Sequence, residues 1–502
     1  MKFVVSVKQM TDAELRSEEI GVCRVRLMRN AAESILKFLE DKFPDLLEKN
    51  IAVICGSGNN GGDGAVLSCL LRAKGVDACV VLPDKFPNTD TAAECLKEFQ
   101  KTELKTIKDR SMIEAVIKRA DIILDCVFGT GFHGELPENA AEIFKLAADA
   151  EAVKISVDIP SGVNGNTGII AENSFKPDIT LVLAAMKTGL LNLPCNDFCG
   201  DIEILDIGIT DGCCEEYDGV FTEHEIKKAF PKRPRSSNKG SFGKLLNIAG
   251  CNKYIGASLL SSRAALRSGA GLVTLAAVER VIPIAAAYIP ECVFTELPSD
   301  NEGYISEKAI KEIGAVMDNY SSVSMGCGMG NRESTKKIAE FLIKNGKSPL
   351  ILDADGINSI SGNINVLKDK SRPVILTPHP AEFGRLIGLT PAEVQADRLN
   401  LAKSFALEYG VILLLKGAYT VIAAPDGRVR VNSTGNTALA KAGCGDVLTG
   451  IIGALAAQGV EPFTAAVLGA YLHGEAADFL VKEQAAASVL ASEVAEALGK
   501  VI

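Results

Sequence analysis

Two α/β domains in succession are the fold that this 502-residue sequence predicts. Short apolar runs alternate with helix-patterned segments along both halves, which is typical of parallel sheets wrapped by helices. Several runs end in Gly-rich loops with polar side chains, where such sheets bind ligands. Residues 206–219 form a polar, turn-rich break, and the chain is too long for one typical core. We therefore predict domains at 1–218 and 219–502.

The first half begins with a region from about Lys8 to Glu48 that is predicted to be helical, because apolar residues recur there at helical spacing. The I-A-V-I-C run predicts a buried strand, followed by the Gly-rich loop 56–64 and a helix ending at Gly75. The loop is neither a G-x-G-x-x-G fingerprint nor a Walker loop. Alternation with helices predicts a doubly wound parallel sheet. The other predicted strands are A-C-V-V-L-P, D-I-I-L-D-C-V-F, K-I-S-V-D-I-P and D-I-T-L-V-L-A-A-M-K-T-G.

Polar side chains cluster at the predicted carboxyl ends of these strands. They are Asn60, Asp63, Asp125, Asp158 and Ser161. One Asp at a strand end is usually explained by turn chemistry. Three strand-end loops that each combine glycine with a polar side chain favour a ligand site in the crevice above the sheet.

The second half repeats the alternation from K-L-L-N-I-A-G to V-I-L-L-L-K-G-A-Y-T-V-I-A and then enters the stretch 434–459. This stretch is small, Gly-rich and polar up to Gly445 and apolar after Asp446, which predicts a loop running into a buried helix. Gly443 and Gly445 let a ligand approach the backbone, and the helix N-terminus favours an anion. Asp446 could take a proton from a hydroxyl that attacks a phosphoryl group. The alternative is that Asp446 only caps the helix.

Composition excludes several classes of function. The net charge of −10 and a pI near 5.2 argue against a nucleic-acid binder that relies on a basic surface. No apolar run is long enough to span a membrane, and the first residues are too short a run for a signal peptide. The 14 cysteines are scattered without a C-x-x-C pair, so we expect reduced thiols and a cytoplasmic protein.

Motifs in both halves resemble those of one family. The first half contains N-N-G-G-D-G, F-G-T-G-F-H-G-E and V-D-I-P-S-G, and the second contains K-G-S-F-G, G-A-G-L-V, L-D-A-D-G-I-N, T-P-H-P-A-E-F, L-K-G-A-Y-T and G-C-G-D-V-L-T-G. Together and in this order they resemble the bifunctional NAD(P)H-hydrate repair enzymes. That family fuses a Rossmann-like NAD(P)H-hydrate epimerase domain to a ribokinase-like, ADP-dependent (S)-NAD(P)H-hydrate dehydratase domain.

For the first domain, the resemblance implies interconversion of the two epimers of the hydrated nucleotide. Asp158 would be the acid or base at the hydrated carbon, and a structural Asp in a turn is the alternative. The resemblance places potassium on Asn60, Asp125 and Ser161, whose oxygens suit a hard cation. The implied substrate contacts are Asn59, Asn60, Gly61, Gly62, Asp63, Gly129, Thr130, Gly131, Phe132, His133, Gly134, Glu135 and Asp158.

For the second domain, the resemblance implies phosphorylation of the hydroxyl on the hydrated ring, with Asp446 as catalytic residue, followed by loss of phosphate. Residues 443–445 would form the anion hole for the transferring group. Cys327 and Cys444 stand where the family usually has Pro and Thr or Ser. The implied substrate contacts are Ala270, Gly328, His379 and Asp446, and the implied nucleotide contacts are Lys416, Gly417, Ala418, Tyr419, Thr420 and Gly445.

The resemblance implies ADP as phosphoryl donor, because fused enzymes of this kind use ADP, and magnesium to offset the phosphate charge. We expect NAD(P)H hydrate and ADP as ligands, a homo-oligomer, and neither a nucleic-acid nor a membrane partner. Two alternatives stay open. One is a ribokinase-like vitamin or sugar kinase with an accessory N-terminal domain, and the other is a non-enzymatic scaffold.

Overall fold

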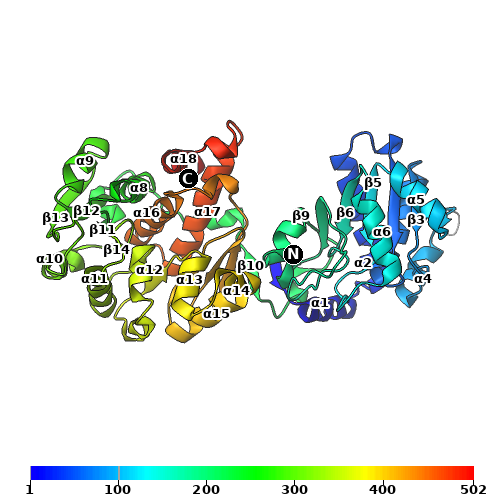
Figure 1. Cartoon of the computed structure of the whole chain (residues 1–502), viewed down its shortest axis with the longest axis horizontal. Coiled ribbons are helices and arrows are strands. Elements are labelled where there is room, and N and C mark those ends of the chain that lie inside the picture. Colours follow the sequence, from blue (N-terminus) through cyan, green and yellow to red (C-terminus); the bar gives the residue numbers. More distant parts are fainter. Residues whose placement is uncertain (1, 100–101) are drawn as a thin grey trace. The chain divides into compact units, whose positions relative to one another are not determined.

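The computed structural model describes residues 2–99 and 102–502. The chain divides into two compact units, Met1–Val220 and Phe221–Ile502. Each unit is built from a largely parallel sheet with helices packed against it (Figure 1). The predicted fold class, one α/β domain after another, is confirmed.

The first unit contains a seven-stranded sheet in the order β4-β3-β2-β5-β6-β7-β9, and all of its neighbouring strands run parallel. The reversal of strand order beside β2 is the topological switch point at which such sheets bind ligands. The strands are β2 (Asn50–Cys55), β3 (Asp77–Val81), β4 (Thr106–Ile107), β5 (Ile122–Cys126), β6 (Val153–Val157), β7 (Ile179–Leu183) and β9 (Asp201–Leu205).

Helices cover both faces of this sheet, as the doubly wound prediction requires. Alternate residues of β2 point to opposite faces: Val53 joins the core cluster of α2 and α3, whereas Ile54 joins the cluster of α5 and α6. Three short strands lie outside the seven-stranded sheet: β1 (Phe3–Val5) pairs in parallel with β8 (Met186–Lys187) and antiparallel with β10 (Gly219–Phe221). The helices are α1 (Val7–Glu19), α2 (Arg24–Lys42), α3 (Asn59–Ala73), α4 (Asp90–Lys97), α5 (Arg110–Arg119), α6 (Glu138–Ala148) and α7 (Cys195–Phe198).

The helical character predicted for about Lys8 to Glu48 is confirmed, whereas one predicted helix start is wrong. The region contains two helices, because the chain turns at Gly21, whose φ of 96° breaks the α-helix. Helix α3 begins at Asn59, so the N-N-G-G-D segment forms its first turns instead of a loop. Glycine permits this start: a Cβ on Gly61 would lie 1.8 Å from the carbonyl oxygen of Gly56.

The second unit has the strand order β13-β12-β11-β14-β15-β16-β17-β18-β19, parallel up to β17 and antiparallel thereafter. The carboxyl ends of the parallel strands therefore share one edge. The strands are β11 (Lys244–Ile248), β12 (Leu272–Val278), β13 (Val293–Leu297), β14 (Ser322–Met325), β15 (Leu350–Leu352), β16 (Val374–Leu376), β17 (Ile412–Leu415), β18 (Thr420–Ala423) and β19 (Val429–Asn432).

The main apolar core of this unit lies between the sheet and the C-terminal helices, where Ile451 and Leu468 pack with Ile375 and Leu414. No helix among residues 2–99 and 102–502 has the length and apolarity needed to cross a membrane. The helices are α8 (Ile255–Arg267), α9 (Val281–Tyr288), α10 (Ala309–Val316), α11 (Glu333–Lys344), α12 (Asp355–Ile360), α13 (Pro380–Ile387), α14 (Pro391–Ala396), α15 (Arg398–Tyr409), α16 (Cys444–Ala457), α17 (Pro462–Leu480) and α18 (Ala491–Val501).

Candidate active sites

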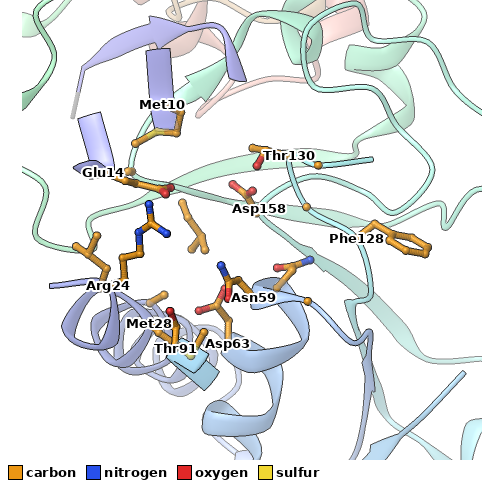
Figure 2. Close-up of a pocket in the computed structure, with 18 of the residues that line it drawn as sticks. Met10, Glu14, Arg24, Met28, Asn59, Asp63, Thr91, Phe128, Thr130 and Asp158 are labelled. Atoms are coloured by element: carbon orange, nitrogen blue, oxygen red, sulfur yellow. The ribbon is translucent and has the colours of Figure 1, made fainter. Parts of the chain in front are cut away.

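A cavity of about 500 Å³ lies at the carboxyl ends of β2, β5 and β6 in the first unit. Helices α1 and α2 close it from the other side with residues such as Glu14 and Met28 (Figure 2). The sequence-predicted residues that line it are Asn59, Asn60, Asp63, Gly129, Thr130, Gly131, Phe132 and Asp158. The crevice predicted from strand-end polar residues is therefore present as a cavity.

Some predicted contacts lie elsewhere in this unit. Gly61 and Gly62 serve close packing of α3, because a Cβ on Gly62 would lie 2.6 Å from the Met28 methyl group. His133, Gly134 and Glu135 are exposed, and the His133 ring hydrogen-bonds the Asn164 side chain at 3.1 Å. Their contact with substrate stays a prediction.

Asp158 forms a buried ion pair in the cavity. Lys187 donates to its Oδ1 at 2.5 Å and to the Leu183 carbonyl at 2.8 Å, and the Lys187 side chain is 1% exposed. A Cβ on Gly129 would lie only 3.1 Å from Asp158 Oδ2, so glycine keeps that second oxygen accessible. Asp158 also has a φ of 69°, a strained conformation for a non-glycine residue that is concentrated at functional sites. Lys187 therefore fixes Oδ1 of Asp158, and Oδ2 beside Gly129 stays accessible in the cavity.

Two further carboxyl groups face the same cavity. Figure 2 shows Glu14 and Asp63 pointing into it with Asp158, from α1 and α3. Burial, followed by the charge of Asp158, raises the pKa of both Glu14 and Asp63, and the Asp63 pKa lies well above its usual value. Environments that separate the protonation states of neighbouring carboxyls are typical of acid–base sites. This cavity combines a carboxylate paired with a lysine and a carboxyl, that of Asp63, whose neutral form is favoured by burial.

Asn60, Asp125 and Ser161, the residues predicted to hold potassium, are all buried. Asp125 is fully buried and accepts from the Ser161 hydroxyl at 2.6 Å and the Ser161 backbone N–H at 2.8 Å. Burial raises the pKa of Asp125 to about 6 despite these bonds. Asn60 Oδ1 is buried and has no hydrogen-bond partner among the described residues. An unsatisfied buried amide oxygen and a buried carboxylate are both oxygen ligands that suit a hard cation.

A second polar centre lies at the carboxyl ends of β15, β16 and β17. Asp353, 1% exposed, accepts through Oδ1 from the Thr377 hydroxyl at 2.7 Å and from Lys416 Nζ at 2.9 Å. These three residues follow adjacent parallel strands, so the sheet topology brings them together. The charge of Asp353 raises the pKa of Lys416 although burial opposes it. The pair holds an ammonium group in the site, where it can face an anion.

Asp446 joins this centre from the first turn of α16. Gly443, with a φ of 94°, takes the N-cap position, so Asp446 is not the helix cap. Burial, followed by the charge of Asp353, raises the pKa of Asp446 to about 6. A Cβ on Gly445 would lie 3.2 Å from Lys416 Nζ. The helix N-terminus, the ammonium group and a carboxylate that ionises near neutrality thus meet at one point.

The buried side chain of Arg398 hydrogen-bonds the backbone of the predicted nucleotide loop 416–420 and of the residue before it. This guanidinium is 1% exposed and donates to the carbonyls of Ala418 and Leu415. Glycine is needed at position 417 for two reasons: its φ is 150°, and a Cβ there would lie 2.6 Å from Arg398 Nη2. Tyr419 has a φ of 51°. A strained loop fixed by a buried cation presents a preorganised backbone.

The remaining predicted residues of the second unit differ in position. His379 Nδ1 accepts from the N–H groups of Ala381 and Glu382, so its ring caps α13. Gly328 follows β14 and packs against Tyr254. Ala270 precedes β12 and lies at the opposite edge of the parallel sheet, about seven residues or ~23 Å of strand away. The structure does not bring Ala270 together with the other predicted contacts.

Comparisons with known proteins cover both units. A family model described as NAD(P)H-hydrate dehydratase matches residues 245–500, and one described as YjeF-related protein N-terminus matches residues 24–189. A bifunctional NAD(P)H-hydrate repair enzyme Nnr from Moorella thermoacetica is 34% identical over 100% of this chain and 96% of its own length. The enzyme of the same name from Escherichia coli is 31% identical, with 97% and 91% covered.

The chain belongs to the bifunctional NAD(P)H-hydrate repair enzymes. The resemblance inferred from motifs is thereby confirmed, and membership in this enzyme family replaces the kinase and scaffold alternatives. Among solved structures, an ADP/ATP-dependent NAD(P)H-hydrate dehydratase from Bacillus subtilis, co-crystallized with ATP/Mg2+, is 34% identical over 56% of this chain and 96% of that chain, with a TM-score of 0.49.

Several residues of these two centres were not identified as site residues from the sequence. They are Glu14, Arg24, Lys187, Asp353 and Arg398. A signal was present for Lys187 and Asp353, because each stands in or beside an apolar run where a solvated charge is unusual. Arg398 carries no such signal, since its partners are backbone carbonyls distant in sequence.

Proposed function

We propose that the first unit interconverts the R and S epimers of hydrated NADH and NADPH. The second unit would use ADP to dehydrate the S epimer, giving NAD(P)H, AMP and phosphate. The observation that carries the proposal is the pair of separate acid–base centres. One holds Asp158 against Lys187 in a cavity, and the other holds Asp446 beside Lys416 at a helix N-terminus.

In the epimerase centre, Asp158 is the proposed acid or base at the hydrated carbon. Lys187 fixes Oδ1 and leaves Oδ2, beside Gly129, to exchange the proton. Asp63 is the proposed partner on another wall of the cavity, because burial favours its protonated form. Arg24, which also lines the cavity, would offset the negative charge of the nucleotide.

Potassium is the proposed ion of the first unit. Asn60, Asp125 and Ser161 fit it, because the Asn60 amide oxygen is buried and unsatisfied and the Asp125 carboxylate is buried without a cationic partner among the described residues. A bound cation would favour the ionised form of Asp125 and order the neighbouring loops, which carry Gly129 and Asp158.

In the dehydratase centre, Asp446 is the proposed base that takes the proton of the substrate hydroxyl as its oxygen attacks the β-phosphoryl group of ADP. The O–P bond to AMP breaks. The phosphorylated oxygen then leaves the ring as phosphate while the neighbouring ring carbon loses a proton to solvent, which restores the double bond of the dihydronicotinamide. Lys416 and the amides at the start of α16 would stabilise the charge of the transferring group. Magnesium supplied with the nucleotide would neutralise phosphate charge, and the Asp353 carboxylate, whose Oδ2 is not held by Thr377 or Lys416, fits it as an oxygen ligand.

ADP is the proposed donor instead of ATP. The chain has no Walker loop to wrap a triphosphate, and a single Gly-rich turn at 443–445 suffices for the one group transferred. The test compares kcat/KM for each nucleotide with the S epimer, using ATP freed of ADP. A higher kcat/KM with ATP would reverse the choice of donor and leave the dehydratase assignment intact.

The proposed domains, 1–218 and 219–502, follow the two units closely. Each should be active alone: the first should interconvert the epimers, and the second should dehydrate only one of them. Assembly into a homo-oligomer in the cytoplasm is also proposed, and sedimentation of the full chain measures the first point. The function itself is tested by giving the full chain ADP and an equilibrium mixture of both epimers. Dihydronicotinamide absorbance should recover completely, whereas recovery that stops when the S epimer is exhausted would remove the epimerase assignment.

A further inference from the structure

One thiol sulfur and two carboxylate oxygens, all possible metal ligands, converge in the dehydratase centre. The thiol of Cys327 and carboxylate oxygens of Asp353 and Asp446 all lie within 4.8 Å of one another. They come from the loop after β14, the end of β15 and the first turn of α16, so the tertiary fold creates the group. Cys327 and Asp353 are each 1% exposed, which makes this an interior cluster and not a surface accumulation of acids.

The orientation of Asp353 leaves one of its oxygens for this group. Its Oδ1 accepts from Thr377 at 2.7 Å and Lys416 at 2.9 Å, whereas Oδ2 faces the Cys327 sulfur at 3.9 Å. A zinc ion takes sulfur at about 2.3 Å and carboxylate oxygen at about 2.0–2.2 Å, so a sulfur–oxygen separation of this size spans one ion at an open angle. The buried hydrogen bonds to Oδ1 hold the carboxylate in the orientation that the ion requires.

Charge also matches a divalent cation. Once a metal has displaced the thiol proton, which burial otherwise retains by raising the Cys327 pKa, a thiolate and two carboxylates carry three negative charges. The Lys416 ammonium on Asp353 offsets one of them. The nearby Asp355 carboxylate accepts from the Gly330 backbone N–H at 2.7 Å and is not one of the three ligands. The remaining double negative charge is the complement of a 2+ ion. Sulfur selects thiophilic cations, whereas magnesium prefers oxygen.

We propose that Cys327, Asp353 and Asp446 form a binding site for a thiophilic divalent cation such as Zn²⁺ or Cd²⁺, and that occupancy inhibits dehydration. On binding, the Cys327 S–H bond breaks, its proton passes to solvent, and sulfur donates an electron pair to the ion without any change of oxidation state. Asp446 would then be a ligand and could no longer accept the substrate proton. The metal site rests on geometry alone, and its inhibitory effect rests on the function proposed for Asp446.

Metal binding is tested on the chelator-treated full chain by titration with Cd²⁺, following the ultraviolet charge-transfer absorbance of a cadmium–thiolate bond. The wild type should bind one equivalent with this band, and Cys292→Ser, which removes a buried thiol elsewhere in the unit, should match it. Cys327→Ser should lose the band and bind at least about tenfold more weakly. Equal bands and equal affinities in the two variants would overturn the site.

A measurement on the wild type keeps the test independent of how the variants fold. X-ray absorption at the zinc edge should show one sulfur among oxygen or nitrogen ligands, and a sulfur-free or sulfur-rich shell would contradict the site. For inhibition, Zn²⁺ should block dehydration of the S epimer in the wild type at a concentration at least about tenfold below that needed with Cys327→Ser. Epimerisation should continue. Equal inhibition of the wild type and Cys327→Ser by Zn²⁺ would contradict the inhibitory role. The metal site itself would still be decided by the Cd²⁺ titration.

Discussion

Lys187 Nζ lies 2.5 Å from Asp158 Oδ1, and the lysine side chain is almost completely buried. The pair fixes the carboxylate at the wall of the cavity of the first unit, opposite Glu14 and Asp63. Removing one partner of a buried pair leaves an uncompensated charge, which costs far more than loss of a surface salt bridge. The position of Lys187 therefore controls the group that we propose exchanges the proton.

Lys187→Met should lower the rate of epimerisation by about 100-fold or more, within the range for a misplaced acid–base group. Dehydration of the S epimer should be unchanged, because Lys187 belongs to the first unit. The matched control is Lys118→Met, which removes an exposed lysine of α5. The loss should appear in kcat for epimerisation more than in KM, because Lys187 positions the Asp158 carboxylate. Near-normal epimerisation by a folded Lys187→Met protein would contradict this role.

Asp446→Asn should abolish dehydration and spare epimerisation. The amide has the same shape but cannot accept the hydroxyl proton, so the expected loss is on the order of 100- to 10,000-fold in kcat. Helix α16 should persist because Gly443 occupies its N-cap position. Single-turnover assays with the S epimer measure the effect. Turnover close to that of the wild type would exclude Asp446 as the base.

The dehydration rate should depend on pH through Asp446, whose pKa burial raises to about 6. The ionised form is the base, so kcat at saturating ADP should fall by up to tenfold per pH unit below pH 6 and level off above it. The residual rate of Asp446→Asn should lack this limb, which separates Asp446 from titration of the nucleotide phosphate. A limb that survives in the variant would assign the pH dependence to another group.

Asp125→Ala should weaken the dependence of epimerisation on potassium. This carboxylate is fully buried, and it is the anionic ligand of the proposed ion site, so its removal deletes that charge. The concentration of potassium at half-maximal rate should rise at least about tenfold. Asp121→Ala, at the start of β5 away from the cavity, is the control. Superimposable rate-versus-potassium curves for Asp125→Ala and wild type would remove Asp125 from the site.

Local pattern predicted the elements that place both centres. Apolar runs located β2, β5 and β6, and the Gly-rich segments after them located the cavity, because strand ends in a parallel sheet meet at one edge. The helical region near 8–48 was predicted, but the break between its two helices was not, since that break depends on the single positive φ of Gly21. Helix α3 started earlier than predicted because its glycines serve packing against Gly56 and Met28.

Long-range pairing was the information that the sequence did not contain. Lys187 reaches Asp158 across 29 residues, and Lys416 reaches Asp353 across 63, so neither pair follows from local spacing. Ala270 shows the converse: its motif suggested a place beside the ligand, but the direction of β12 puts it at the other edge of the sheet. Sheet direction and strand order decide which motifs share a site.

The purified R epimer, given with ADP and magnesium, tests most directly whether one chain carries both reactions. The wild type should restore dihydronicotinamide absorbance faster than the spontaneous rate measured without protein. Asp158→Asn should recover absorbance from the S epimer alone and fall to the spontaneous rate with the R epimer. Equal recovery from the R epimer by Asp158→Asn and wild type would contradict the assignment of epimerisation to the first unit.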